Sequence, residues 1–300
     1  MSLSGVRETA CLAGLCVPGY YVPMLSYRHA FHAGNHGDVL KHSVLMYTLA
    51  YLRQKEKSFL YMDTHAGAGA YRLEEGYALQ NREWEGGIGR IMGEESPLPG
   101  LLSRYREFQE TVYRRDAAYA GSPLIARHLL RDADRAICFE LHPNDFLVLG
   151  RTLEGDKRFQ IKKEDGLGGL KAALPPDTGR GCVFMDPSYE IKEDYSAIPL
   201  ALGKAFKRFR QGTYIIWYPL LNSTDTSSYP EQLLEACPAP CCRAELLVRG
   251  RNETSRGMYG SGLIIINHPW KLDEELSEAL PRMAEIMGDS DASWTLECSG

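Results

Sequence analysis

The sequence lacks the signatures of several common protein classes. None of its 300 residues lies in a run that approaches the roughly 20 apolar residues of a membrane span. It contains no G-K-S/T and no H-E-x-x-H, and its one glycine-rich turn, which ends at Gly69, does not complete G-x-G-x-x-G. These absences disfavour a membrane-spanning protein, a P-loop NTPase, a zinc protease and a dinucleotide-dependent dehydrogenase.

Positive charge is also scarce. The chain has 34 Lys and Arg against 39 Asp and Glu, a formal charge of −5. Proteins that coat nucleic acid are usually basic. Any contact with nucleic acid is therefore expected to be local, through Arg28, His29, His32 and Lys41, with a shallow dependence on salt.

The eight cysteines include no C-x-x-C pair, and Cys138 and Cys182 lie inside apolar runs typical of buried strands. We therefore expect reduced cysteines, a cytoplasmic protein and no metal site.

Near the N-terminus, Met24 begins a stretch that is more typical of a folded protein than the residues before it. Residues 1–23 are therefore expected to be a flexible extension or tag. Residues 24–300 would then form the functional domain.

Apolar runs alternate with amphipathic stretches along this domain, which predicts an α/β fold with a doubly wound, mainly parallel sheet. Strands are expected at 58–63, 136–141, 159–165, 181–186, 213–218, 244–248 and 263–267. Helices are expected at 38–57, 143–153, 195–209 and 271–287. Residues of about 71–120 contain no convincing strand and are interpreted as a helical insertion after the first strand.

Four of the expected strands end in an acid: Asp63, Glu140, Asp165 and Asp186. Ligands of open α/β sheets bind outside the carboxyl ends of the strands, so these acids could surround one ligand. Gly67, in the turn after Asp63, would let the backbone approach that ligand closely. Glu140 is suited to accept hydrogen bonds from ribose hydroxyls. A nucleoside with a charged tail fits this pattern better than a dinucleotide.

The fourth acid opens Asp186-Pro-Ser-Tyr189. The N6 amine of adenine is a poor nucleophile, and it could be oriented by the Asp186 carboxylate and the Pro187 carbonyl, while Tyr189 stacks on the base. A plain β-turn is the alternative for an Asp-Pro-Ser sequence. Its position after the last of four acid-ended strands favours catalysis.

Four of the eight histidines lie between Tyr27 and His42, in YRHAFHAGNHGDVLKH. His32 and His36 have a spacing that could bind a metal on a helix. Because Arg28 and Lys41 flank the run, we favour the wall of a polar, cationic pocket.

From Met24 onward the chain resembles the ribosomal RNA large-subunit methyltransferase J family, which methylates an adenine N6 of 23S rRNA. The resemblance rests on the segments YRH, HAGNH, DVLKH, DTHAGAG, GSPLIAR, ELHP, WYP and NHPWK. It implies a Rossmann-like fold that uses S-adenosylmethionine, with Asp186 as the catalytic acceptor and Tyr27 in contact with RNA. It also implies cofactor contacts at Lys41, His42, His65, Ser122, Glu140, Asp165 and Gly166.

One position departs from the family. The family usually has Asp-Pro-Pro-Tyr, and this chain has Ser188 at the third position of that motif. The change removes a fixed φ and is expected to reduce preorganisation without abolishing activity. Two alternatives stay open: an adenine-N6 methyltransferase acting on DNA, and a non-catalytic protein involved in the use of external DNA. The favoured interpretation is a monomer that methylates protein-free 23S rRNA.

Overall fold

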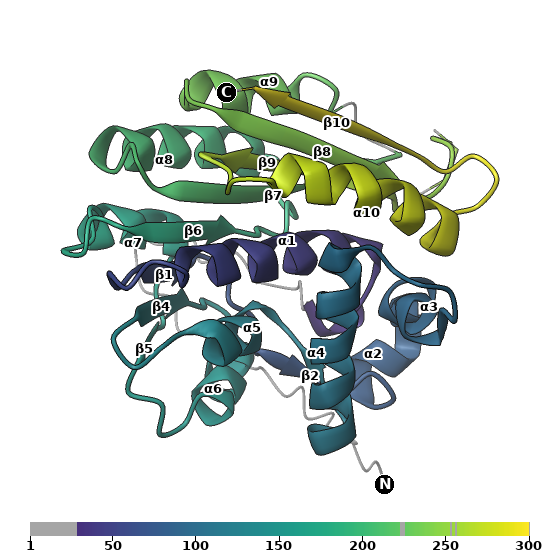
Figure 1. Ribbon diagram of the computed structural model, residues 1–300, viewed down its shortest axis with the longest axis horizontal. Helices are drawn as coiled ribbons and strands as arrows, with labels where there is room; N and C mark the ends of the chain where they lie inside the picture. The colour runs from purple at the N-terminus through teal and green to yellow at the C-terminus, as the bar shows by residue number, and fades with distance from the viewer. Residues whose placement is uncertain (1–28, 223–225, 253, 256, 300) are drawn as a thin grey trace, which may run out of the picture.

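A mixed eight-stranded sheet forms the centre of the protein (Figure 1). The structure is a computed structural model, and it describes residues 29–222, 226–252, 254–255 and 257–299. The strand order is β10-β8-β9-β7-β6-β1-β4-β5. The strands are β1 (Leu60–Asp63), β4 (Arg135–Phe139), β5 (Phe159–Lys162), β6 (Gly181–Met185), β7 (Thr213–Leu221), β8 (Cys241–Leu247), β9 (Met258–Ile266) and β10 (Ser293–Ser299).

The expected α/β class is confirmed, and the sheet has a parallel and an antiparallel half. Strands β5, β4, β1, β6 and β7 are parallel to their neighbours, and β9, β8 and β10 then pair antiparallel. The prediction of a mainly parallel sheet therefore holds only as far as β7. β6 and nearly all of β7 are buried, as their continuous apolar sequences require.

Helices cover both faces of the sheet. Helices α1, α4, α5 and α10 pack together on one face, where α1 and α10 lie side by side (Figure 1), and α7, α8 and α9 form a second group. The helices of the two groups are α1 (His36–Leu52), α4 (Gly100–Asp116), α5 (Ser122–Leu129), α7 (Gly166–Ala173), α8 (Asp194–Arg208), α9 (Tyr229–Ala236) and α10 (Leu272–Met287). Helix α6 (Pro143–Thr152) packs against the edge strand β5.

Helix α1 begins with a side-chain cap and ends earlier than predicted. Asn35 accepts a hydrogen bond from the Asp38 amide at 3.0 Å, which satisfies one of the free amides of the first turn. The helix ends at Leu52 instead of Lys57. The carbonyls that follow are bound by side chains instead of by a further helical turn: Arg131 donates to the Arg53 and Lys55 carbonyls at 3.2 and 2.8 Å.

The segment after β1 is helical and is enclosed by a small pair of strands. β2 (Ala70–Tyr71) and β3 (Tyr119–Ala120) pair antiparallel, and α2 (Gly76–Asn81), the 3-10 turn η2 (Glu83–Gly86), α3 (Ile88–Gly93) and α4 lie between them. A further 3-10 turn, η1 (His29–Phe31), precedes α1 and contacts α2. Gln109 ties α4 to β3, since its side chain both donates to and accepts from the backbone of Ala120 at 2.9 Å. This segment stands beside the N-terminal end of α1 (Figure 1).

Three further predictions need correction. β5 ends at Lys162 instead of Asp165, because the Asp165 carboxylate caps α7 by accepting from the Leu167 and Gly168 amides at 3.2 and 2.9 Å. Strand β10 was not predicted. Cys242 on β8 and Cys298 on β10 are paired directly across these strands and form a disulfide, so the expectation of reduced cysteines is wrong for this pair.

Within the described ranges, no helix is long and apolar enough to cross a membrane. In the same residues, no group of three or more His, Cys, Asp or Glu side chains is arranged to hold a metal ion.

Candidate active site

The carboxyl ends of β1, β4 and β6 meet at one edge of the sheet and border a cavity of about 540 Å³. The register pairs Asp63, the last residue of β1, with Cys138 and Phe184, so that Glu140 and Asp186 follow their strands at the same level. The cavity walls contain nine of the predicted site residues: His42, His65, Gly67, Ser122, Glu140, Asp165, Gly166, Asp186 and Pro187.

Glu140 is held by two backbone amides in this cavity. The Gly67 amide donates to one carboxylate oxygen at 2.8 Å, and the His142 amide donates to the other at 2.6 Å. Burial raises the pKa of Glu140 to about 7. Gly67 has φ +59°, and a Cβ there would lie 2.2 Å from the Tyr71 hydroxyl, so both the turn and the close packing require glycine.

Asp63 lies beneath the cavity and is not part of its wall. Its carboxylate accepts hydrogen bonds from the Tyr61 and Ser122 hydroxyls at 2.7 Å each, and burial raises the pKa of Asp63 to about 6. The side chain thus joins β1 to the first residue of α5. Its structural role is to fix the cavity floor, which differs from the direct cofactor contact expected for it.

Gly166 permits a close approach of two backbone segments at the cavity. A Cβ on Gly166 would lie 2.1 Å from the Thr64 carbonyl oxygen, just after β1. This contact brings the N-terminus of α7 against the β1 loop. The Asp165 carboxylate, which caps that helix, is exposed at the cavity wall.

Two histidines in the cavity wall are neutral at physiological pH, because burial lowers the pKa of both His42 and His65 to about 4. His42 Nδ1 lies 2.8 Å from the Tyr119 hydroxyl, and His65 Nδ1 lies 2.8 Å from the Thr64 hydroxyl. They offer hydrogen bonds to a ligand without adding charge.

Asp186 is joined to a buried lysine. Lys41 Nζ lies 2.7 Å from the Asp186 carboxylate and 2.8 Å from that of Asp38. Burial opposes the charge on Lys41, but the two carboxylates outweigh it and raise the pKa of Lys41 above its usual value. Lys41 is therefore protonated, and its ammonium also lies 4.8 Å from the centre of the Trp217 ring. It is absent from the cavity wall and reaches the site through Asp186.

One predicted substrate residue, Tyr189, does not line the cavity. The Tyr189 ring is buried beside Tyr195 and Tyr229, and its hydroxyl donates to the Trp217 carbonyl at 2.8 Å. Tyr189 has φ +51°, a conformation that L residues rarely adopt and that is often found at functional sites. Tyr27 lies outside the described residues.

The sequence did not single out three residues that the fold brings to the site: Asp38, Tyr71 and Asp194. Asp38 accepts from the Gly34 amide at 2.8 Å and from His29, which itself lines the cavity, at 3.0 Å. The i, i+3 spacing of Asp38 and Lys41 on a helix was the available signal. Tyr71 and Asp194 line the cavity from distant segments that no spacing connects.

A nucleoside with a charged tail fits these residues. Glu140 supplies carboxylate acceptors for ribose hydroxyls, while Leu141, Leu167 and Ile191 give the same cavity an apolar wall. Asp186 also lines the cavity, so its carboxylate places a hydrogen-bond acceptor in the wall. A Rossmann-like sheet with a cavity of this kind at the carboxyl ends of its strands defines a class of nucleoside-binding α/β proteins.

Comparison with known proteins narrows this class to one family. Residues 56–299 match the family described as "Ribosomal RNA large subunit methyltransferase D, RlmJ". Two proteins named Ribosomal RNA large subunit methyltransferase J, from Haemophilus influenzae and Escherichia coli K12, are each 42% identical to this chain over 278 residues. The alignments cover 91% and 90% of this chain and 98% and 99% of those proteins. The chain therefore belongs to the RlmJ family of ribosomal RNA large-subunit methyltransferases, as the resemblance in its sequence predicted.

A solved structure agrees with this assignment. The crystal structure of a Legionella pneumophila protein is similar to this chain with a TM-score of 0.81 and 33% sequence identity, over 89% of this chain and 98% of that one. The fold of this chain is thus shared with that protein.

Proposed function

We propose that this protein transfers a methyl group from S-adenosylmethionine to the N6 amine of an adenine in 23S ribosomal RNA. The observation that carries the proposal is the position of Asp186. It follows β6 directly, borders the cavity at the carboxyl ends of the strands and is fixed by the protonated side chain of Lys41 at 2.7 Å. Family membership supports the reaction and the substrate class.

The cavity side chains would hold the cofactor. Glu140 would accept hydrogen bonds from the ribose, the Asp165–Gly166 turn would border the adenine, and His42, His65 and Ser122 would contact the remainder. When bound, the cofactor supplies an electrophilic methyl group on a sulfonium. The protein contributes orientation and the exclusion of water, which convert a bimolecular reaction into one between two fixed groups.

Asp186 acts on the adenine. A carboxylate has about four acceptor sites, so the bond to Lys41 leaves capacity to accept one N6 hydrogen, while the Pro187 carbonyl accepts the other. These two acceptors hold the amine in place and favour the positive charge that develops on N6 as the methyl group bonds to it. Lys41 fixes the carboxylate, and the N6 proton leaves toward that acceptor or solvent.

The adenine must leave its stack to reach this site. We propose that Tyr189 then stacks on the base and that Tyr27 contacts the RNA. For Tyr189 this requires the ring to turn out of the aromatic cluster in which it now packs. The left-handed backbone conformation of Tyr189 is of the kind that is found at functional sites.

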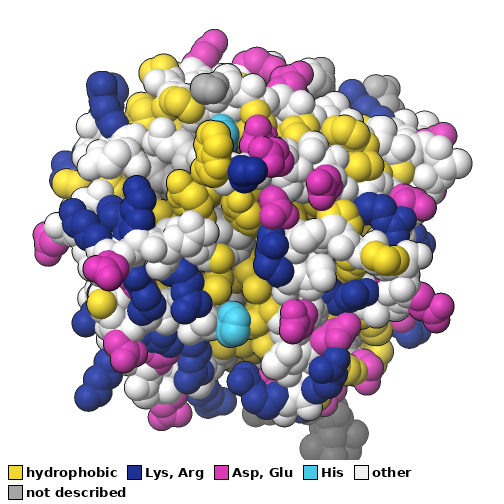
Figure 2. Space-filling model, in the orientation of Figure 1, with side chains coloured by type: hydrophobic (Ala, Val, Ile, Leu, Met, Phe, Trp, Pro, Cys, Tyr) yellow, Lys and Arg dark blue, Asp and Glu magenta, His cyan; other side chains and the backbone are white. Residues whose placement is uncertain are grey.

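The charge distribution supports a small RNA contact. On the face in Figure 2, basic and acidic side chains are interspersed. We propose that the protein acts on RNA free of ribosomal protein, since a short unpaired segment can enter the site without a broad basic surface. We also propose that it is a monomer and that it acts in the cytoplasm.

The test is transfer of radiolabelled methyl from S-adenosylmethionine to protein-free 23S rRNA, single-stranded DNA and duplex DNA, followed by nucleoside analysis. The proposal predicts N6-methyladenosine in the RNA alone. Label only in DNA would support a DNA methyltransferase. No label in any substrate, with the cofactor shown to bind, would support a non-catalytic protein.

A further inference from the structure

A second cavity, of about 540 Å³, lies beside the candidate active site. Its walls come from the first residues of α1, from the helical segment around η2 and α3, and from the residues on either side of the β8–β9 connection. Three arginines and one histidine line it: Arg82, Arg90, Arg249 and His36. The proposed reaction leaves this cavity without a role.

Helix α1 connects the two sites. His36 is its first residue, and Lys41, which binds Asp186, follows five positions later. A helix rises about 1.5 Å per residue, so these two backbone positions are roughly 7.5 Å apart along the axis. Met258, in the wall of this cavity, pairs with Leu221 at the carboxyl end of β7, so both cavities lie at the same edge of the sheet, along which a nucleic-acid strand bound at Asp186 can extend.

His36 has one ring nitrogen available. The side chain is only 9% exposed, and among the described residues its Nε2 has no hydrogen-bond partner. Burial lowers the pKa of His36 to about 4, so the imidazole is neutral. A neutral imidazole that donates through Nδ1 has an acceptor at Nε2. A buried acceptor of this kind usually has a partner in the functional state.

The arginines differ in what they already bind. Arg90 donates to the Ile286 and Gly288 carbonyls at 3.1 and 3.4 Å, and Arg82 pairs with Glu85. In the part of the chain that the structure describes, the exposed Arg249 guanidinium has no hydrogen-bond or ion-pair partner. The five N–H donors of a guanidinium can form paired hydrogen bonds to a phosphate.

The acidic side chains of this cavity already form hydrogen bonds within the protein. Glu83 is hydrogen-bonded to His32 at 2.8 Å and to the Asn35 side chain at 3.1 Å. Asp289 accepts from the Asp291 amide at 2.9 Å. Both carboxylates keep their negative charge, but the three arginines of the cavity outnumber them, and Arg249 and Nε2 of His36 are left without a partner among the described residues.

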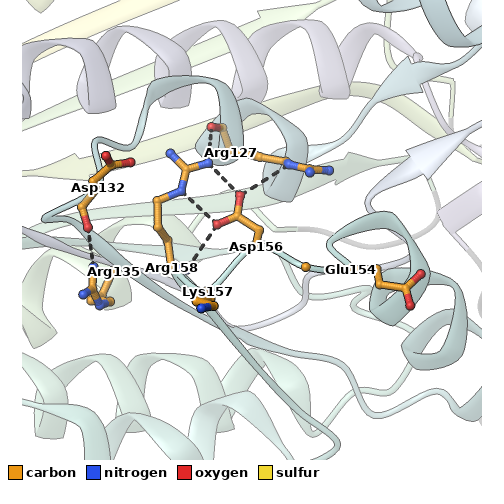
Figure 3. Close-up of a pocket in the computed structure, with 8 residues that line it drawn as sticks. Arg127, Asp132, Arg135, Glu154, Asp156, Lys157 and Arg158 are labelled. Atoms are coloured by element: carbon orange, nitrogen blue, oxygen red, sulfur yellow. Dashed lines mark hydrogen bonds and ion pairs between the residues drawn. The ribbon is translucent and has the colours of Figure 1, made fainter.

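A cavity at the opposite edge of the sheet gives the contrast (Figure 3). It has about 600 Å³ and several basic residues, but each arginine drawn there has a partner. Arg158 and Arg127 both bind Asp156, at 2.6 and 3.4 Å, and Arg135 donates to two backbone carbonyls at 2.7 Å. The arginines of this cluster are bound by neighbouring carboxylates and carbonyls, and they stabilise the N-terminal ends of β4 and β5. The cavity at His36 differs, because it still has hydrogen-bonding groups without a partner among the described residues.

We propose that the cavity at His36 binds the nucleotide next to the target adenosine in the RNA strand. Arg249 binds its phosphate, and Nε2 of His36 accepts a hydrogen bond from its ribose 2′-hydroxyl. This inference rests on the proposed function and adds the means of choosing RNA over DNA, because the 2′-hydroxyl is the group that distinguishes them.

The test uses a 23S rRNA fragment that contains the methylated adenosine, and two copies with a single 2′-deoxyribose immediately 5′ or 3′ of it. For the wild-type protein, one of the two substitutions should lower kcat/KM about 3- to 10-fold, the range of one net hydrogen bond. His36→Leu should show that loss with every substrate and should no longer distinguish the deoxy copy. His36→Gln, which keeps an acceptor, should restore part of the discrimination.

Arg249→Ala tests the inference independently of His36, at an exposed residue. It should raise KM several-fold without changing kcat, and it should reduce the salt slope of RNA binding by about 0.7, the value of one phosphate contact to a single strand. Arg210→Ala is the matched control, because Arg210 is exposed just before β7 at the opposite edge of the sheet. Thermal unfolding and S-adenosylhomocysteine binding check that each variant is folded.

Three outcomes would overturn the inference: wild-type activity that ignores both deoxy substitutions, Arg249→Ala indistinguishable from Arg210→Ala, or His36→Leu that still discriminates. In each case wild-type protein methylates the RNA, so the proposed function stands. If wild-type protein methylates no RNA, the proposed function fails and this inference fails with it.

Discussion

At the scale of single residues, the buried charges around Lys41 set both stability and chemistry. Lys41 is 3% exposed and lies between the carboxylates of Asp38 and Asp186. Removing one member of a buried charge group leaves the others uncompensated, at a cost of about 3–5 kcal/mol. A neutral replacement of Lys41 therefore leaves two carboxylates facing each other.

Lys41→Met should lower the free energy of unfolding by about 3–5 kcal/mol, measured by urea denaturation. The double variant Lys41→Met/Asp38→Asn should be less destabilised than the sum of the two single variants, since it removes a charge from each side. Additive effects would show that the two side chains are not coupled. An unchanged unfolding midpoint for Lys41→Met would rule out the charge group as described.

Glu140 gives a pH-dependent prediction. Its pKa of about 7 in the folded protein means that it is largely protonated below neutral pH. Ribose hydroxyls that donate to the carboxylate favour the ionised form, so cofactor affinity should fall as pH falls below about 7 and level off above it. Calorimetric titration with S-adenosylhomocysteine from pH 5.5 to 8.5 measures this.

The matched variant is Glu140→Gln, which should bind more weakly at pH 8 and lose most of the slope. Asp63, with its pKa raised to about 6, titrates in the same range, so some slope remains in the variant. Equal slopes in the two proteins would assign the pH dependence to Asp63 and contradict the role given to Glu140.

At the scale of elements, the contact between α7 and the β1 loop shapes the cavity. Gly166→Ala places a Cβ against the Thr64 carbonyl, and overpacking of this kind costs about 1–3 kcal/mol. We expect lower stability and weaker cofactor binding together. Gly150→Ala in α6, where no atom lies within 4 Å of the new Cβ, should instead stabilise the protein slightly. Thermal unfolding compares the two, and an unperturbed Gly166→Ala protein would contradict the contact.

The elements also show how far the sequence could be interpreted. The buried strands β1, β4, β6 and β7 are predictable because a short apolar run bounded by turns is typical of a strand buried on both faces. Helix α7 was missed because GLGG at its start has low helix propensity, and the Asp165 cap and tertiary packing stabilise it instead. Strand β10 is an exposed edge strand whose polar residues give no core signal.

The candidate site was predictable to a similar extent. Acids at strand ends and the Asp186-Pro turn are local patterns in the sequence. Nine of the site residues that were predicted from these patterns and from the resemblance line one cavity. The bond between Lys41 and Asp186 and the burial of Tyr189 depend on side chains that only the tertiary fold brings together. No periodicity in the sequence encodes them.

At the scale of the whole molecule, a net charge of −5 limits how RNA is bound. Of the three arginines around the second cavity, Arg82 pairs with Glu85 and Arg90 binds two backbone carbonyls, which leaves Arg249 for a phosphate. One to three phosphate contacts would give a slope of log affinity against log salt between about −0.7 and −2, at roughly −0.7 per contact with a single strand. Fluorescence anisotropy of a labelled rRNA fragment across salt concentrations measures it. A slope several times steeper would indicate a broad basic interface and contradict this account.

The central claim is that Asp186 orients the adenine amine, and the most direct test is methyl transfer to protein-free 23S rRNA by Asp186→Ala. The account predicts a loss of roughly 100-fold or more in kcat, with S-adenosylhomocysteine binding nearly intact. Asp177→Ala, which removes an exposed acid from the loop before β6, should behave as wild type. Near-wild-type turnover by Asp186→Ala would contradict the account and move the chemistry elsewhere in the cavity.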